Sequence, residues 1–280
     1  MNFQTFLKLG RVSNLPTVWT NALAGAVLTG HTSIAIVLFL GVSLSFLYVG
    51  GMWLNDAFDA EIDARDRKDR PIPNGEVSER TVFMGGFAFL AAGVVCAFWL
   101  GFSAGLAGLC LAGVIVLYDW LHKRTILSPV IMGSARFFCY VVAALAVSGA
   151  VTGSVVLGAL GLLLYTAGLT YAAKQEAYDR LDRAWPLGIL AIPIVYALMQ
   201  VSSFGTLVIW AGLVLVVLLA LRRLFRRDKG DVPKAVVTLI AGISLYDATL
   251  IAATGQAMFA FVAVAGFFLT LALQRVVTGT

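Results

Sequence analysis

Residues 55–79 read NDAFDAEIDARDRKDRPIPNGEVSE, a strongly polar stretch between two long apolar runs. The carboxylates of Asp56, Asp59 and Asp63 are spaced by three and four residues, which places them on one face of a helix. Carboxylates brought this close repel one another unless a cation joins them. Oxygen ligands without sulfur suit Mg²⁺, which usually shares its shell with substrate phosphates.

The basic residues of the same stretch support two interpretations. Several Arg and Lys side chains, Arg70 among them, are close enough in sequence to balance the remaining charge of a phosphate group. Alternatively, the stretch is a solvated loop whose acids and bases pair with one another. The ordered spacing of Asn55 and the three aspartates beside an apolar run favours a site for a metal ion and a diphosphate, with Asn55 as a further substrate ligand.

The composition of the whole chain places this stretch at the edge of a membrane. Of the 280 residues, 60% are apolar and 12% are charged, and the mean hydropathy is +0.91. Soluble domains carry about 25% charged residues, so the sequence predicts a polytopic membrane protein with one transmembrane domain, residues 1–280. The net charge of +5 is concentrated beside the apolar segments. Basic residues in these positions set the orientation of the spans in the membrane and attract anionic lipids, so we do not interpret them as a nucleic-acid-binding surface.

Ten apolar segments are candidates for membrane helices. Only helices satisfy their backbone hydrogen bonds as single segments in lipid, so the predicted fold is an all-α transmembrane helix bundle. The predicted segments are residues 14–30, 33–54, 81–100, 104–121, 129–148, 153–173, 186–201, 205–224, 235–253 and 257–274.

The connections between these segments alternate in charge. The turns near His31, Ser103, Gly149, Ser203 and Gly255 contain no Asp, Glu, Lys or Arg, whereas the opposite ends hold almost every Lys and Arg. The positive-inside rule places the basic side in the cytoplasm, which predicts an even number of spans and two cytoplasmic termini. We expect an integral multi-pass membrane protein, in the cell membrane if the source is bacterial, with the polar stretch facing the cytoplasm.

Two blocks of the polar stretch resemble the first aspartate-rich motif of the UbiA-type intramembrane prenyltransferases. They are Asn55-Asp56-x-x-Asp59-x-x-x-Asp63 and Arg70-Pro71-Ile72-Pro73-Asn74-Gly75. The resemblance implies an enzyme that transfers a prenyl group from a prenyl diphosphate to an acceptor, often aromatic, with Mg²⁺ as cofactor. It also implies a central cavity open to the cytoplasmic side. The family typically has nine helices, so we expect nine to ten, with one of the last two segments interfacial or broken.

A second acidic loop spans residues 174–185. The second motif of the family is usually Asp-x-x-x-Asp and binds a second Mg²⁺, but here Glu176, Asp179 and Asp182 are spaced by three. Such steps still place neighbouring carboxylates near one face of a helix. We expect Glu176 and Asp179 to form a second metal half-site, with Asp182 as a third candidate. The alternative is a solvated helix end in which these acids pair with adjacent Lys and Arg residues.

The end of the fourth segment, Tyr118-Asp-Trp-Leu-His-Lys-Arg124, resembles the Tyr-rich turn of the family, whose lysine reaches the diphosphate. Lys123 is the candidate for that role and Arg124 is the second choice. The positive-inside rule alone would also place basic residues here. We expect His122 to be an interfacial side chain rather than a metal ligand, because no second histidine is near.

Two charged residues fall inside predicted spans, where ionisable groups are costly and therefore candidates for function. Arg136 either extends the phosphate site or pairs with an acid such as Asp119. Asp247 either pairs with Arg136 or touches an acceptor.

Near the N-terminus, the family holds its acceptor with an Arg and an Asn. Arg11, Asn14 and Asn21 are the matching residue types here. The alternative is an interfacial arginine followed by a helix start of the form Asn-x-Pro.

Together these residues predict Mg²⁺-dependent transfer of a prenyl group to a small acceptor, expected to be aromatic, within the membrane. Asp56, Asp59, Asp63 and Lys123 form the expected catalytic set. The alternative function is a non-catalytic membrane carrier or binding protein for a prenylated or phosphorylated lipid, which the irregular spacing of the second acidic loop favours.

Overall fold

The computed structural model describes residues 1–174 and 185–277. Within these ranges all regular structure is helical and no strand occurs, as the sequence predicts. Seven helices in this described part are long and apolar enough to cross a membrane. They are α3 (Ile34–Phe58), α5 (Glu79–Leu100), α6 (Phe102–Leu121), α7 (Ser128–Ser148), α8 (Gly153–Lys174), α10 (Phe204–Arg226) and α11 (Asp231–Ala253). The shorter elements are α1 (Phe3–Leu9), η1 (Val12–Asn14), α2 (Leu15–Val27), α4 (Ala60–Asp66), η2 (Trp185–Leu190), α9 (Ala191–Met199) and α12 (Ala257–Leu273).

Each of the ten predicted segments corresponds to a helical element, but three of them form helices shorter than the rest. These are α2 with 13 residues, α9 with 9 and α12 with 17. The broken segment is the seventh, which divides into η2 and α9. Pro193 has no N–H to donate to a preceding turn, so the α-helix begins at Ala191 and holds Pro193 in its first turn. The number of membrane crossings stays a prediction.

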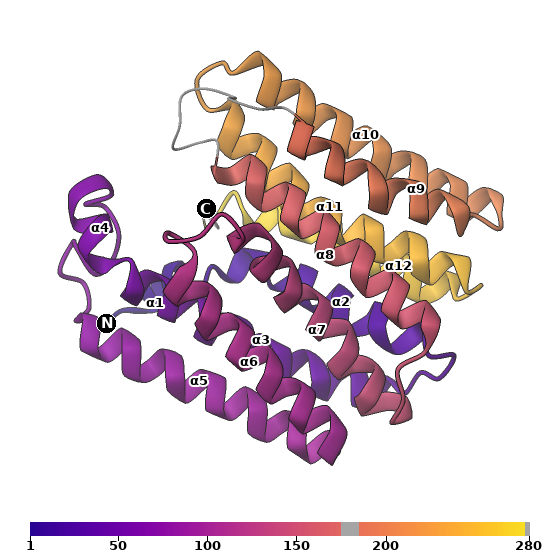
Figure 1. Cartoon of the computed structure of the whole chain (residues 1–280), viewed down its shortest axis with the longest axis horizontal. Coiled ribbons are helices and arrows are strands. Elements are labelled where there is room, and N and C mark those ends of the chain that lie inside the picture. Colours follow the sequence, from indigo (N-terminus) through magenta and orange to yellow (C-terminus); the bar gives the residue numbers. More distant parts are fainter. Residues whose placement is uncertain (175–184, 278–280) are drawn as a thin grey trace.

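The helix α2 lies at the centre of the bundle, where it packs against α3, α7, α11 and α12. Two hydrophobic cores meet there. One joins α8, α10, α11 and α12, the other joins α3, α5, α6 and α7, and α2 and α7 contribute to both. In Figure 1, α5 and α10 form opposite edges of the bundle, and α4 and the α10–α11 connection lie toward the same end.

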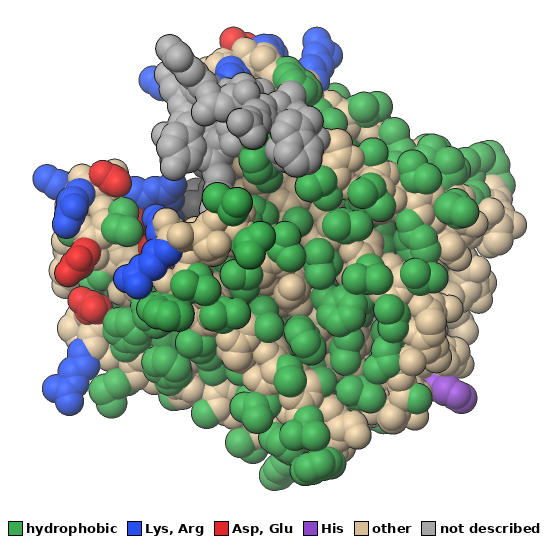
Figure 2. Space-filling view, in the orientation of Figure 1, with side chains coloured by type: hydrophobic (Ala, Val, Ile, Leu, Met, Phe, Trp, Pro, Cys, Tyr) green, Lys and Arg blue, Asp and Glu red, His purple; other side chains and the backbone are tan. Residues whose placement is uncertain are grey.

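The outer helices carry large exposed apolar side chains, as expected for a surface that faces lipid. Figure 2 shows these apolar side chains across most of the visible face, whereas the charged side chains gather at the end that carries α4 and the α10–α11 connection. Examples on α5 and α10 are Met84, Phe87, Trp99, Phe204, Leu215 and Leu218. The charge segregation that the sequence predicts is therefore present, and the side of the membrane to which it belongs stays a prediction.

Close packing of α3 against α5 brings the polar stretch to this end of the bundle. A Cβ atom at Gly50 would lie 2.8 Å from the carbonyl oxygen of Gly86, so the two backbones approach closely enough to exclude a side chain. The antiparallel pair is joined by residues 59–78, whose turn at Gly75 uses a positive φ of 74°. The last turn of α3 is consequently fixed at the charged end of the molecule.

Candidate active site

The acidic cluster, which we define as Asp56, Asp59 and Asp63, spans the junction of α3 and α4. Asp59 lies between the two helices, yet its N–H donates to the carbonyl of Asn55 at 3.0 Å and the N–H of Asp63 donates to the carbonyl of Asp59 at 2.8 Å. Helical geometry thus continues through the junction. The three residues are only 4%, 8% and 6% exposed, so the carboxylates face the protein rather than the surrounding water.

Two arginines from distant segments converge on one oxygen of Asp56. Nη2 of Arg11 and Nη1 of Arg70 each lie 2.9 Å from Oδ1, and Arg11 also donates to Asn55 at 3.2 Å. Burial lowers the pKa of Arg70, and the positive charge of Arg11 lowers it further. Two guanidinium groups on one carboxylate leave an excess of positive charge, which is suited to an anionic ligand.

Asp59 is held by two basic residues that follow α6. Its Oδ2 lies 3.3 Å from Nζ of Lys123 and 3.2 Å from Nε2 of His122. Burial raises the pKa of Asp59, but the hydrogen bond from His122 and the charge of Lys123 outweigh it, so the pKa lies below its ordinary value.

His122 corrects one expectation from the sequence. The residue is 8% exposed rather than interfacial, because the turn after α6 folds back over the end of α3. Nδ1 contacts the carbonyl oxygen of Asp119 at 3.1 Å, and the ring stacks on Tyr118 at a centroid distance of 5.1 Å. These contacts fix the imidazole against the acidic cluster.

Asp63 is the carboxylate of the cluster that makes no hydrogen bond or ion pair with the other described side chains. Burial raises its pKa, Arg70 offsets part of this rise, and the two neighbouring carboxylates add to it. The oxygen-only donor set fits Mg²⁺. Among residues 1–174 and 185–277, however, no three His, Cys, Asp or Glu side chains already converge as a metal site. Coordination of Mg²⁺ by this cluster therefore stays a prediction.

The second metal half-site predicted from the sequence stays a prediction. Its residues, Glu176, Asp179 and Asp182, lie outside the described residues.

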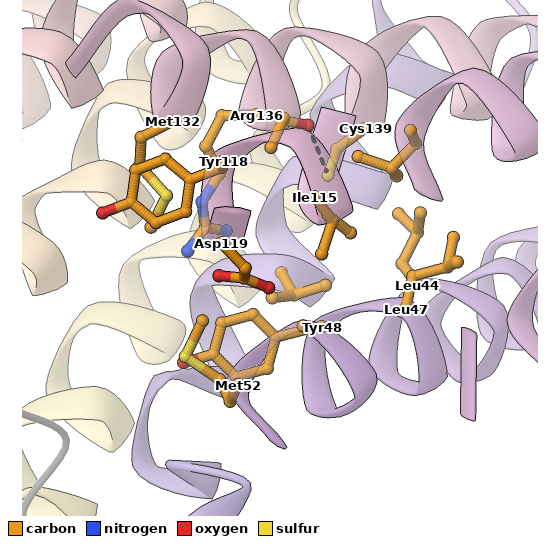
Figure 3. A pocket seen from close by; sticks show the side chains of 14 residues that line it. Leu44, Leu47, Tyr48, Met52, Ile115, Tyr118, Asp119, Met132, Arg136 and Cys139 are labelled. Carbon is orange, nitrogen blue, oxygen red and sulfur yellow. Dashed lines mark hydrogen bonds between the residues drawn. The ribbon is translucent and has the colours of Figure 1, made fainter. Parts of the chain in front are cut away.

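A pocket begins beside the acidic cluster and runs into the bundle (Figure 3). Its empty volume is about 570 Å³, including the open mouth, and its walls come from α2, α3, α6 and α7. Most lining side chains are apolar, Leu44, Leu47 and Ile115 among them. The polar exceptions are Tyr48, Tyr118, Asp119 and Arg136. Asn55 donates to Oδ1 of Asp119 at 3.1 Å, and Arg11 donates to both Asn55 and Asp56. The pocket and the acidic cluster are therefore connected through Asn55.

Arg136 enters this pocket from α7 and is anchored by neutral groups. It donates to Oδ1 of Asn21 at 2.7 Å and to Oγ1 of Thr17 at 3.0 Å, while its guanidinium lies 6.0 Å from the ring centre of Tyr48. Asn21 in turn donates to Asp247 at 2.7 Å. The two intramembrane charges are thus linked through an amide, and the direct ion pairs considered from the sequence do not form among the described residues.

The remaining predicted residues lie further from the acids. Asn14 donates to the hydroxyl of Tyr48 at 3.2 Å, at the rim of the pocket. Arg124 is exposed, and its guanidinium lies 5.9 Å from the ring centre of Trp120. Thr17 and His122 were not predicted as site residues. His122 carried a usable signal, since it stands four residues after Tyr118 and next to Lys123, whereas Thr17 carried none.

Comparison with known proteins identifies the family. A model of the UbiA prenyltransferase family matches residues 13–243. The chain belongs to the UbiA prenyltransferase family. It is accordingly a prenyltransferase, an enzyme class that transfers alkyl groups larger than methyl, and the resemblance seen in the aspartate-rich motif is confirmed.

Relatives of this chain include digeranylgeranylglyceryl phosphate synthases. A digeranylgeranylglyceryl phosphate synthase of Methanopyrus kandleri is 30% identical over 201 residues, which cover 69% of this chain and 70% of the relative. A synthase of the same name from Thermococcus kodakarensis is 27% identical over 216 residues, 74% of each chain.

Solved UbiA structures share the fold. A UbiA homologue from Aeropyrum pernix superimposes with a TM-score of 0.70 at 19% identity, covering 86% of this chain and 98% of the other. A homologue from Archaeoglobus fulgidus bound to GPP and Mg²⁺ gives 0.54 at 16% identity, with 94% and 99% coverage.

Proposed function

We propose that this protein transfers a prenyl group from a prenyl diphosphate to an acceptor within the membrane, in a reaction that depends on Mg²⁺. One observation carries the proposal: basic side chains from three separate segments converge on a buried acidic cluster at one end of an apolar pocket. That arrangement suits a ligand with a charged head and a hydrocarbon tail. A diphosphate occupies the charged end and the prenyl chain lies along the apolar walls.

The basic residues bind the diphosphate head. Arg11 and Arg70 provide planar guanidinium groups that can each make two hydrogen bonds to a phosphate, and Lys123 adds a point charge. Mg²⁺ bound by Asp56 and its neighbours in the cluster supplies charge neutralisation that makes diphosphate a better leaving group. The bond between the allylic carbon and the diphosphate oxygen then breaks as the acceptor attacks that carbon.

The apolar walls protect the reacting carbon. An allylic carbon that develops positive charge reacts with any water within reach, so the site must exclude water during transfer. Leu44, Leu47 and Ile115 line the pocket, and their side chains provide no hydrogen-bond partner for water. The same surface packs against the hydrocarbon chain of the donor.

For the acceptor, we favour a prenylated glyceryl phosphate over an aromatic compound. The sequence led us to expect an aromatic ring, but the relatives described above are named for the product digeranylgeranylglyceryl phosphate. An acceptor for that product carries one hydroxyl nucleophile and one phosphate. The segregation of basic residues supports the cytoplasmic side of the membrane as the location of the reaction.

Replacement of Asp59 tests the function. The wild-type protein in lipid nanodiscs, supplied with geranylgeranyl diphosphate, Mg²⁺ and geranylgeranylglyceryl phosphate, should release diphosphate and form a product detected by mass spectrometry. Asp59→Ala should lower this turnover by about 100-fold or more, since charge stabilisation of this kind contributes that much. The variant should keep its melting temperature, and Asp231→Asn, a buried acid outside the site, serves as control.

Two results would contradict the proposal. Undiminished transfer in Asp59→Ala would remove the acidic cluster from the mechanism. Tight binding of prenyl diphosphate without release of diphosphate, with either geranylgeranylglyceryl phosphate or 4-hydroxybenzoate as acceptor, would support the non-catalytic carrier instead.

A further inference from the structure

Asp119 has one carboxylate oxygen with no partner. The residue lies in α6, is 3% exposed and lines the pocket. Asn55 donates to Oδ1 at 3.1 Å, whereas Oδ2 is buried and makes no hydrogen bond within the described part of the chain. Figure 3 shows this carboxylate inside the pocket, between the rings of Tyr48 and Tyr118. A buried oxygen without a partner is costly, and a ligand with a hydrogen-bond donor would remove that cost.

Two other buried aspartates, Asp231 and Asp247 in α11, differ from Asp119. Both oxygens of Asp231 accept hydrogen bonds from Arg226, each at 2.8 Å. Both oxygens of Asp247 are also satisfied, by Tyr140 at 2.6 Å and Asn21 at 2.7 Å. Asp231 and Asp247 therefore use both carboxylate oxygens, whereas Asp119 uses only Oδ1 within the described part of the chain.

Arg136 supplies the complementary charge in the same pocket. Its guanidinium points toward Asp119 in Figure 3, yet no ion pair joins the two residues among the described side chains. Its hydrogen-bond acceptors, Asn21 and Thr17, are both neutral. A guanidinium has five N–H donors, so donors remain for a ligand. The pocket thus presents one carboxyl group and one guanidinium group that make no direct contact with each other.

We propose that Asp119 is the proton acceptor for the hydroxyl nucleophile of the acceptor substrate, and that Arg136 binds an anionic group of the same molecule. The inference rests on the proposed prenyl transfer and adds the residues that select and activate the acceptor. An acceptor held by both residues is oriented with its hydroxyl toward the diphosphate end of the pocket, because Asp119 is the residue that Asn55 connects to the acidic cluster.

The acceptor oxygen forms a bond to the allylic carbon, while the bond between that carbon and the diphosphate oxygen breaks and its electron pair leaves with diphosphate. The hydroxyl proton passes to Oδ2 of Asp119. No oxidant, reductant or further reactant is required, and the products are a prenyl ether, diphosphate and one proton.

Two variants with matched controls test the assignment. Asp119→Asn keeps the shape and an oxygen for Asn55 but cannot take the proton; Asp231→Asn is its control. Arg136→Gln removes the charge; Arg223→Gln is its control, because Arg223 donates to Thr238 at 2.9 Å and does not line the pocket. Stabilisation by geranylgeranyl diphosphate with Mg²⁺, measured as a shift in melting temperature, should be the same in all four variants and shows that the donor site is folded.

The kinetic parameters should separate the two roles. Asp119→Asn should lower kcat by about 100-fold with the KM for the donor unchanged, as expected for loss of a general base. Arg136→Gln should raise the KM for geranylgeranylglyceryl phosphate by about tenfold, the range for loss of one charge-assisted contact. With geranylgeranylglycerol, which lacks the phosphate, wild type and Arg136→Gln should react equally slowly. With 4-hydroxybenzoate, a sensitivity to Arg136→Gln would identify a carboxylate as the bound anion.

Several results would overturn the inference. Full kcat in Asp119→Asn would exclude proton transfer to this residue. An equal loss in Arg136→Gln for acceptors with and without phosphate would make Arg136 a structural residue. Binding of geranylgeranylglyceryl phosphate alone, in the absence of donor, should weaken in Arg136→Gln. Equal binding would overturn the acceptor site even if the wild type proved to be a carrier, so failure of the inference is distinguishable from failure of the proposed function.

Discussion

Nη2 of Arg11 and Oδ1 of Asp56 lie 2.9 Å apart, although 45 positions of sequence separate the two residues. Arg11 reaches this contact with a backbone φ of 41° and ψ of 47°, in the left-handed region. Residues other than glycine rarely adopt that conformation, and they keep it only where surrounding contacts hold them there. The segment before α2 is therefore fixed onto the end of α3, and its side chain becomes part of the charged end of the pocket.

Removal of either arginine at Asp56 should weaken donor binding. We expect Arg11→Gln and Arg70→Gln each to raise the KM for prenyl diphosphate by about tenfold, because each loses one charge-assisted contact while the other guanidinium remains. Steady-state kinetics at saturating acceptor measure this effect, with Arg223→Gln as control. An unchanged KM for the donor in both variants would place the diphosphate elsewhere.

His122 should influence the affinity for Mg²⁺ through Asp59. The imidazole lies 3.2 Å from Oδ2 of that carboxylate, and loss of a group that orients a metal ligand costs about 10- to 100-fold in metal affinity. We expect His122→Ala to raise the Mg²⁺ concentration for half-maximal activity by about tenfold. His31→Ala is the control, because His31 lies in the exposed turn between α2 and α3. An identical Mg²⁺ titration for both variants would contradict the role.

The close contact of α3 and α5 should be sensitive to one added methyl group. A Cβ at Gly50 would meet a backbone oxygen at 2.8 Å, whereas a Cβ at Gly113 in α6 has no neighbour within 4 Å. We expect Gly50→Ala to lower the free energy of unfolding by about 1–3 kcal/mol, the usual cost of overpacking. Gly113→Ala should leave it unchanged or slightly raised. Thermal unfolding in detergent, followed by tryptophan fluorescence, measures the stability of both variants. Equal melting temperatures for the two variants would show that α3 and α5 accommodate the added methyl group without loss of stability.

The amide of Asn21 should contribute to stability as a link between α7 and α11. Asn21→Leu removes its contacts with Arg136 and Asp247 together, and we expect a loss of about 1–2 kcal/mol, since hydrogen bonds between membrane helices contribute about that much at most. Thr166→Val is the matched control, because the side chain of Thr166 bonds the carbonyl of Leu162 in its own helix at 2.9 Å and no other described residue. Denaturation in mixed micelles compares the two variants. Equal stability would indicate that water or lipid replaces the amide.

Much of the fold follows from the sequence because lipid leaves few alternatives. Each apolar run must form a helix, so the positions of all ten helical segments could be predicted from hydropathy. Hydropathy does not report where a helix ends inside the bundle. The division of segment 186–201 depends on Pro193, and the short α2 depends on burial by four neighbouring helices. Both effects arise from tertiary packing or backbone geometry rather than from apolar content.

The candidate site could be predicted only in part for a similar reason. The spacing of Asp56, Asp59 and Asp63 is a local property, and the helical junction preserves it. The partners of these acids come from other helices, and no local pattern states which helices become neighbours. His122 was consequently expected at the interface, and the unpaired oxygen of Asp119 could not be anticipated at all, because it depends on the contacts of a complete pocket.

The last helix contacts the segment that delivers Arg11. Gln274, at the end of α12, hydrogen-bonds to Asn14 in η1, and α12 packs on η1 and α2. During synthesis on the ribosome the N-terminal segment enters the bilayer long before residue 274 is translated. A nascent chain therefore lacks this contact, and we expect the segment that carries Arg11 to reach its final position only after α12 has been synthesised.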